Sequence, residues 1–558
     1  MGSFLKTAIA LKGSGIKRSF DRATKDPKAA QERLLKKILR KNQHTVFGKA
    51  HAFTRVDTPN AFSQTTPIHS HTDLLPHIER MKAGERNILT AEDPIMYNLT
   101  SGTTEEPKYL PVTKTGMTLS ADLSNQWLYR ALKDHPTLLY HSSLIISGSS
   151  SEGTTAAGCP YGSASGMIRR GLPRVLRRAF ALPHIVSEIK DYDLRYYVIA
   201  RLALEKEISF VGTPNPTTLV KIAETGIDHQ EEIIRSIREG IISLTPFNLG
   251  PEDTRILSTI NSHLKPNEKR ASHLQDILAR HGRLLPTECW KELQLIGCWL
   301  GGSIGYQAPK LSRYFGDEVP IRDIGYLASE GSFTVPHRDG TSAGILALQN
   351  NYYEFLPENE SAGQGARPLL SHELEAGKRY KIILTTPNGL YRYDIHDIIE
   401  VQEFYNQTPV ISFLRKGEDM LSITGEKLHV NHLLKAFSTL RKRDKLTVTQ
   451  FRAVPNYDEM RYEILVHLGS DLTGEYLRGS LLPTIDKSLS EANIEYASKR
   501  KSHRLNPPCI HVMGPSWEDE VRTKFLSCGN RDIQFKWRMV APEMSEIDVH
   551  HIQYSVQM

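Results

Sequence analysis

The sequence lacks the features that identify several classes of protein. No run of about eighteen apolar residues occurs, so we expect no membrane-spanning helix. No zinc-finger spacing, basic zipper or aromatic RNA-binding motif is present, and a formal charge of +7 over 558 residues is a mild basic excess. No internal repeat or long low-complexity tract occurs either. We therefore expect a globular protein whose partners include neither a membrane nor a nucleic acid.

Cysteine is scarce, and its positions are scattered. The five cysteines form no Cys-x-x-Cys pair; they are Cys159, Cys289, Cys298, Cys509 and Cys528. An odd, dispersed set in a large chain is typical of reduced thiols in a reducing compartment. The first residues begin like a myristoylation site, but Lys6 stands where serine or threonine is required. These observations predict a cytoplasmic location.

The most informative stretch runs from Thr100 to Lys108 and reads Thr-Ser-Gly-Thr-Thr-Glu-Glu-Pro-Lys. Its backbone N–H groups and hydroxyls can converge on phosphate oxygens, and Lys108 supplies a positive charge for the same anion. Short strands are expected on both sides, at 94–97 and 109–112. A Walker-type loop opens a helix instead, so this would be a phosphate loop of another kind. The alternative is a polar surface turn.

Two stretches before this loop allow local predictions. Residues 27–43 have a stripe of Leu34, Leu35, Ile38 and Leu39 among lysines and arginines, which predicts a surface helix packed on the core rather than on a membrane. The histidines at 69, 71 and 77 match no established metal-ligand spacing, and Pro76 should interrupt a helix, so we expect a loop there.

The rest of the chain suggests an α/β protein. Strands are expected at 144–146, 210–212 and 295–300, with a helix-rich segment at about 217–282 between the last two. Strand follows strand from Gly344 to Glu403, including 390–393, which favours an antiparallel sheet or barrel. Beyond residue 415 strands alternate with helices, as in a smaller α/β unit.

Three motifs in one order make the sequence more specific. The loop at 100–108 is followed by Tyr326-x-x-Ser329-Glu330 and then by Tyr391-Arg392-x-Asp394-x-x-Asp397. In this order they resemble the adenylate-forming superfamily, and more narrowly the auxin-responsive acyl-acid amido synthetase family. The resemblance covers nearly the whole chain, including flanking segments at 45–51, 78–85, 425–428, 493–500 and 534–536.

The resemblance implies a fold and an activity. It implies an α/β adenylate-forming fold, with an N-terminal adenylation domain of sheets, barrel and helices at 1–414 and a mobile C-terminal α/β lid domain at 415–558. It implies ATP- and Mg²⁺-dependent activation of a small carboxylic acid as an acyl-adenylate, with release of pyrophosphate. The acyl group then passes to an amine, usually that of an amino acid. A monomer is the default for the family.

The resemblance also assigns roles to residues. An anion must attack an anionic phosphate, so charge neutralisation and alignment come first. The loop would hold the triphosphate, with Lys108 near the leaving pyrophosphate; its residues are Thr100, Ser101, Gly102, Thr103 and Thr104. Glu330 would bind Mg²⁺, Ser329 the α-phosphate, and Asp397 the ribose. The remaining roles are packing on adenine by Tyr326, catalysis by Lys427 and Lys536 after domain closure, and an interdomain hinge at Arg415. The alternative for each is structural: a core ring for Tyr326, turn or surface positions for the others.

Two departures from the family pattern stand out. Relatives commonly carry glycine before the ribose-binding aspartate, where this chain has His396, and Trp537 follows Lys536 where plant relatives have a small residue. Two other functions share parts of the pattern. An acyl-CoA ligase would use a thiol acceptor, and a catalytically silent protein would bind the nucleotide or acyl acid only. The length of the match favours the amide-forming enzyme.

Overall fold

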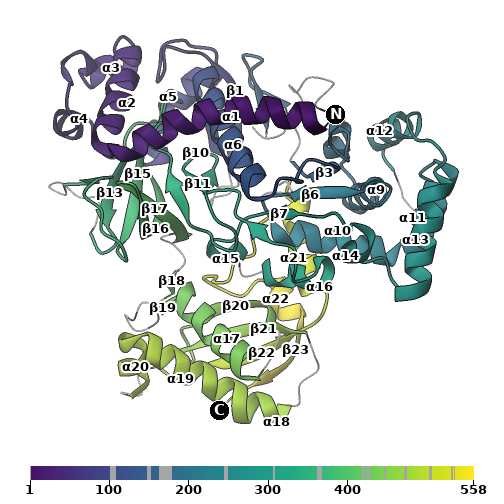
Figure 1. Ribbon diagram of the computed structural model, residues 1–558. Coiled ribbons are helices and arrows are strands. Elements are labelled where there is room, and N and C mark those ends of the chain that lie inside the picture. The colour runs from purple at the N-terminus through teal and green to yellow at the C-terminus, as the bar shows by residue number, and fades with distance from the viewer. Residues whose placement is uncertain are drawn as a thin grey trace. The chain divides into compact units, whose positions relative to one another are not determined.

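The structure is a computed structural model that divides into two compact units, Met1–Leu414 and Arg415–Met558 (Figure 1). The described residues are 2–100, 108–147, 153–162, 177, 179–243, 249–305, 308–360, 367–416, 420–421, 423, 426, 428–444, 448–469, 474–501, 505–529, 532 and 535–557. No helix among them is long and apolar enough to cross a membrane. All five cysteines are free thiols, as the sequence predicts.

The N-terminal helices cover part of the first unit (Figure 1). Asp26 caps α2 by accepting from the backbone N–H of Ala29 at 3.0 Å. Of the predicted stripe, the helix buries Leu35, Ile38 and Leu39 and half-buries Leu34. The sequence did not predict the long helix before it. The helices are α1 (Gly2–Lys25), α2 (Pro27–Asn42), α3 (Val46–Ala50), α4 (Pro59–Thr65), α5 (His71–Lys82) and α6 (Lys114–Asp134).

The loop predicted around His71 and His77 is wrong, because these residues lie on α5. Ser70 and Asp73 form a reciprocal capping box that starts this helix. Pro76 lies on its exposed face, where water can bind the carbonyl group that loses its N–H partner. A proline alone therefore did not rule out a helix.

Two four-stranded sheets lie in the first unit. One has the order β2-β1-β5-β4, and the other is parallel with the order β3-β6-β7-β8. The strands are β1 (Pro94–Thr100), β2 (Lys108–Thr113), β3 (Ser142–Ile145), β4 (Gly153–Thr154), β5 (Pro160–Gly162), β6 (Ile208–Gly212), β7 (Leu295–Gly297) and β8 (Ile321–Arg322). Helix α9 (Tyr192–Leu204) precedes β6. The helix-rich segment joins β6 to β7, as predicted, and its helices are α10 (Pro216–Asp228), α11 (Gln230–Glu239), α12 (Pro251–Asn261), α13 (Glu268–His281) and α14 (Pro286–Cys289). Two short helices follow β7, α15 (Gly302–Gly305) and α16 (Ser312–Phe315).

The predicted antiparallel sheet is a seven-stranded sheet with the order β11-β12-β17-β16-β15-β13-β14. The strands are β11 (Thr334–Pro336), β12 (Gly344–Leu346), β13 (Tyr352–Pro357), β14 (Leu369–Leu370), β15 (Arg379–Thr385), β16 (Tyr393–Tyr405) and β17 (Thr408–Lys416). The strand predicted at 390–393 is wrong for its first three residues. Arg392 has a φ of +44°, which extended backbone does not allow, so β16 begins at Tyr393.

The second unit is a four-stranded sheet, β20-β21-β22-β23, with helices packed on it (Figure 1). Helix α17 packs on β20 through the rings of Phe437 and Phe451, whose centroids are 4.4 Å apart. The strands are β20 (Val448–Asn456), β21 (Arg461–Leu468), β22 (Cys509–Met513) and β23 (Ile552–Val556). The helices are α17 (Val430–Asp444), α18 (Gly474–Tyr476), α19 (Leu482–Ala492), α20 (Ile494–Lys501), α21 (Trp517–Ser527) and α22 (Glu546–His550); β18 (Met420–Leu421) pairs with β19 (Leu428–His429) before them.

Candidate active site

The predicted phosphate loop has an ordered base. Strands β1 and β2 pair antiparallel, with Thr100 opposite Lys108, so the two ends of the loop lie side by side. The two strands that the sequence predicts on either side of the loop are therefore confirmed. Lys108 is half-buried. Residues 101–104 and the side chain of Thr100 lie outside the described residues.

A second element is tied to this base. Strands β9 (Leu327–Ala328) and β10 (Gly331–Ser332) form a hairpin whose two-residue turn is Ser329-Glu330. Asn98 on β1 donates from Nδ2 to the carbonyl oxygen of Ser329 at 3.0 Å. The hydrogen bond fixes the hairpin turn against the strand that leads into the loop. Two of the three sequence motifs thus lie together.

Glu330 also lies near the third motif. Burial and the negative charge of the Glu330 carboxylate raise the pKa of Tyr393, the first residue of β16. Burial is the larger cause, but the charge effect requires the two groups to be close. The half-buried Glu330 therefore lies on a turn beside the loop base, and its charge acts on the first residue of β16.

Tyr326 and Asp397 are in direct contact. The hydroxyl of Tyr326 donates to Oδ2 of Asp397, and both residues are buried. The Tyr326 ring stacks on Phe333 at 4.2 Å and on Phe413 at 5.3 Å between centroids. Burial and the Asp397 carboxylate raise the pKa of Tyr326. These contacts favour the core-ring alternative for Tyr326 and make it a positioning residue for Asp397.

The backbone before Tyr326 requires glycine. Gly325 has a φ of +100°, and a Cβ atom there would lie 2.7 Å from the carbonyl oxygen of Thr334. Its N–H donates to Asp323 at 2.6 Å, and the same carboxylate accepts from the N–H of Leu300 at 2.6 Å. Burial raises the pKa of Asp323 to about 7. Sequence reasoning missed Asp323, whose only signal is an aspartate directly after the short strand β8.

His396 keeps the backbone that glycine would adopt. Its φ is +56°, its side chain is 60% exposed, and its N–H donates to Oδ1 of Asp394 at 2.7 Å. A left-handed conformation costs a residue with a Cβ atom about 1–2 kcal/mol, although histidine is enriched there. The departure from the family pattern therefore adds local strain but leaves the β16 backbone before Asp397 in place.

Arg392 anchors the motif that contains Asp397 through buried hydrogen bonds. Its Nε donates to both carboxylate oxygens of Glu354, at 3.1 and 2.9 Å, and both side chains are almost fully buried. Its Nη1 donates to the carbonyl oxygens of Ser63 and Thr66, at 3.1 and 2.7 Å. This buried cation, directly before β16, joins that strand's start to β13 and to the end of α4.

In the second unit, Lys536 is exposed between two buried aromatic residues, Phe535 and Trp537. The Trp537 Nε1–H donates to the carbonyl oxygen of Phe451 at 2.7 Å, and its ring lies 4.5 Å from the Arg452 guanidinium. The larger residue at this position therefore anchors the segment that carries Lys536 to β20. Lys427 and the side chain of Arg415 lie outside the described residues.

The architecture is that of the adenylate-forming enzymes. A 2-hydroxyisobutyryl-CoA ligase matches with a TM-score of 0.54 at 12% identity, covering 94% of this chain and 91% of that one, which shows a shared fold alone. The likeness to a solved GH3.15 acyl acid amido synthetase is stronger, with a TM-score of 0.82 at 22% identity over 96% and 95% of the two chains.

The sequence places the chain within one family of this class. Models of the GH3 family N-terminal, central and C-terminal domains match residues 16–321, 344–416 and 430–544. The chain belongs to the GH3 family. A jasmonoyl–L-amino acid synthetase of Nicotiana attenuata is 26% identical over 95% of this chain and 93% of its own. An indole-3-acetic acid-amido synthetase of Arabidopsis thaliana is 24% identical over 92% and 89%.

Proposed function

We propose that this protein is an acyl acid amido synthetase, an AMP-forming ligase that joins a small carboxylic acid to an amino acid. The observation that carries the proposal is the hydrogen bond from Asn98 to the Ser329 carbonyl, which joins the phosphate-loop base to the Ser329-Glu330 turn. Membership of the GH3 family along nearly the whole chain supports the same activity.

The reaction has two steps. A carboxylate oxygen of the acid attacks the α-phosphorus of ATP, and the bond to the pyrophosphate oxygen breaks. The amine nitrogen then attacks the acyl carbon, the bond to AMP breaks, and the nitrogen loses a proton to solvent. Both steps depend on alignment and on neutralising phosphate charge rather than on a strong base.

Residues of the first unit take separate parts in this scheme. The N–H and hydroxyl groups of the loop bind the triphosphate, and Lys108 lies near the leaving pyrophosphate; the loop residues are Thr100, Ser101, Gly102, Thr103 and Thr104. Ser329 donates to the α-phosphate. Asp397, held by the Tyr326 hydroxyl, accepts from the ribose.

Glu330 is the residue that would hold Mg²⁺. Its carboxylate lies on a half-buried turn beside the predicted phosphate site, and carboxylate oxygens suit a hard cation that also binds phosphate oxygens. When bound, Mg²⁺ supplies positive charge to the phosphate oxygens. Glu330 and Ser329, adjacent on one turn, would orient the same phosphate group.

Lys427 and Lys536 complete the proposal from the second unit. We expect Lys536→Ala to lower the rate of adenylation by about 10²-fold and to change ATP binding little, because a charge that acts on the transition state affects kcat more than binding. Lys536 is exposed, so the fold should survive. The check is single-turnover pyrophosphate release beside ATP titration, with exposed Lys524→Ala as the matched control. Weaker ATP binding with an unchanged rate would remove Lys536 from this role.

Arg415, the first residue of the second unit, is proposed as the interdomain hinge.

The function itself is tested by pyrophosphate release from Mg-ATP, over a grid of carboxylic acids with and without each amino acid. We expect release that depends on the acid, and an amide product only when the amine is present. Coenzyme A as the sole productive acceptor would instead favour an acyl-CoA ligase. ATP binding without release in any pair would favour a silent binding protein. The relatives named for jasmonoyl and indole-3-acetic acid conjugates make these acids the first to try. A monomer in the cytoplasm stays the prediction.

A further inference from the structure

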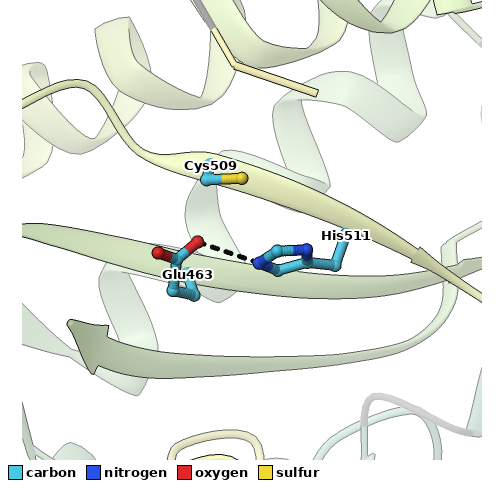
Figure 2. Close-up of side chains that lie close together, drawn as sticks. All are labelled: Glu463, Cys509 and His511. Atoms are coloured by element: carbon cyan, nitrogen blue, oxygen red, sulfur yellow. Dashed lines mark hydrogen bonds and ion pairs between the residues drawn. The ribbon is translucent and has the colours of Figure 1, made fainter. Parts of the chain in front are cut away.

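Three side chains with metal-binding groups meet on the sheet of the second unit (Figure 2). Strands β21 and β22 are parallel neighbours, with Glu463 opposite Cys509 and Leu465 opposite His511. Side chains alternate along a strand, so Cys509 and His511 share a face with Glu463. All three are buried, with exposures of 0% for Cys509, 3% for Glu463 and 9% for His511.

The donor atoms converge on one another. One ligand atom from each residue lies within 4.8 Å of the other two, and His511 Nε2 is 2.9 Å from Glu463 Oε2. In a tetrahedral zinc site, bonds of about 2.0–2.3 Å place neighbouring ligand atoms roughly 3.2–3.8 Å apart. Small side-chain shifts therefore suffice to enclose an ion.

The second donor atoms of these residues are held from outside the cluster. Ser555 Oγ is 2.7 Å from His511 Nδ1. Asn456 Nδ2 and Arg461 Nε donate to Glu463 Oε1 at 2.8 and 2.9 Å. Outer hydrogen bonds of this type fix the tautomer and orientation of metal-binding histidines and carboxylates. They leave Nε2 and Oε2 directed toward the centre of the cluster.

We propose that Glu463, Cys509 and His511 form a binding site for a divalent ion of the zinc type, with the fourth position open to water. Mixed sulfur, nitrogen and oxygen donors suit such ions. Binding replaces the His511–Glu463 hydrogen bond with bonds from the ion to His511 Nε2 and Glu463 Oε2, and the imidazole proton moves from Nε2 to Nδ1, where Ser555 Oγ accepts its hydrogen bond. The third bond forms to Cys509 Sγ, and the thiol proton passes to solvent. The two charges of the ion then balance one thiolate and one carboxylate. The positive charge of Arg461 opposes binding of the ion, but its Nε donates to Glu463 Oε1, whereas Oε2 is the proposed ligand atom.

The test uses the tag-free full chain, stripped with a chelator and titrated with Co²⁺ alone. We expect a thiolate-to-cobalt absorption band and tetrahedral visible bands that saturate at one equivalent and disappear when Zn²⁺ is added. Cys509→Ser should abolish the thiolate band. Cys528→Ser is the matched control and should retain it, because this exposed thiol lies at the end of α21.

A second variant covers the case in which Cys509→Ser does not fold. Ser555 is exposed, so Ser555→Ala should fold normally, and loss of its hydrogen bond to His511 should weaken Co²⁺ binding by about 10–100-fold. Zn²⁺ should also raise the Tm of the wild-type chain. No thiolate band in the folded wild-type chain, or a band that Cys528→Ser removes, would overturn the proposal and leave a metal-free hydrogen-bonded cluster.

Discussion

Glu330→Gln is expected to lower pyrophosphate release from Mg-ATP by about 10³-fold, since a bound metal ion contributes several kcal/mol of charge stabilisation. Glutamine keeps the shape of the side chain and removes its charge. The turn should persist, because the hydrogen bond that ties it to β1 uses the carbonyl of Ser329 and not the Glu330 side chain. The loss should therefore be one of chemistry and not of folding.

The same variant can be checked by a readout other than turnover. ATP binding should be strengthened by Mg²⁺ in the wild-type chain and much less so in the variant. Glu318→Gln makes the same change of charge at an exposed position of the same unit and should leave both readouts unchanged. Unaltered pyrophosphate release in Glu330→Gln would exclude Glu330 from the mechanism.

The sequence predicted the order of the motifs better than the contacts between them. The strands around the phosphate loop and the stripe on α2 follow from local periodicity, and both were predicted correctly. The pairing of Asn98 with Ser329 was not predicted, because it joins residues more than two hundred positions apart. Similarly, nothing local indicates that the Tyr326 hydroxyl meets Asp397 rather than a ligand.

One wrong prediction has a local cause, and one missed cluster has a tertiary cause. Pro76 was interpreted as a break, yet a capping box and an exposed position outweigh the one hydrogen bond that a proline removes. The Cys509–His511 pair has the period of a strand, but Glu463 joins it only through the register of two parallel strands. Register depends on tertiary packing, so no local pattern groups these three residues.

Arg392→Met is expected to lower the free energy of unfolding of the first unit by about 3–5 kcal/mol, the usual loss when one partner of a buried ion pair is removed. Glu354 is 3% exposed and would stay in the core without its cation. The carbonyl groups of Ser63 and Thr66 would lose their donor as well. Urea unfolding followed by circular dichroism measures the loss.

The pH dependence of this loss distinguishes the cost of an unpaired buried Glu354 carboxylate from the cost of a packing defect. Burial already raises the pKa of Glu354, and Arg392 acts in the opposite direction, so the variant should raise that pKa further. A carboxyl whose folded pKa exceeds its unfolded value contributes stability below the unfolded pKa, and this contribution disappears as the pH rises through the folded one. The deficit of Arg392→Met should therefore be largest at neutral pH and shrink toward pH 4.5, the ordinary pKa of glutamate. Adding Glu354→Met should restore part of the stability at neutral pH and remove the pH dependence. A deficit that is equal at neutral pH and at pH 4.5 would show that Arg392 stabilises the first unit by packing and not by its charge.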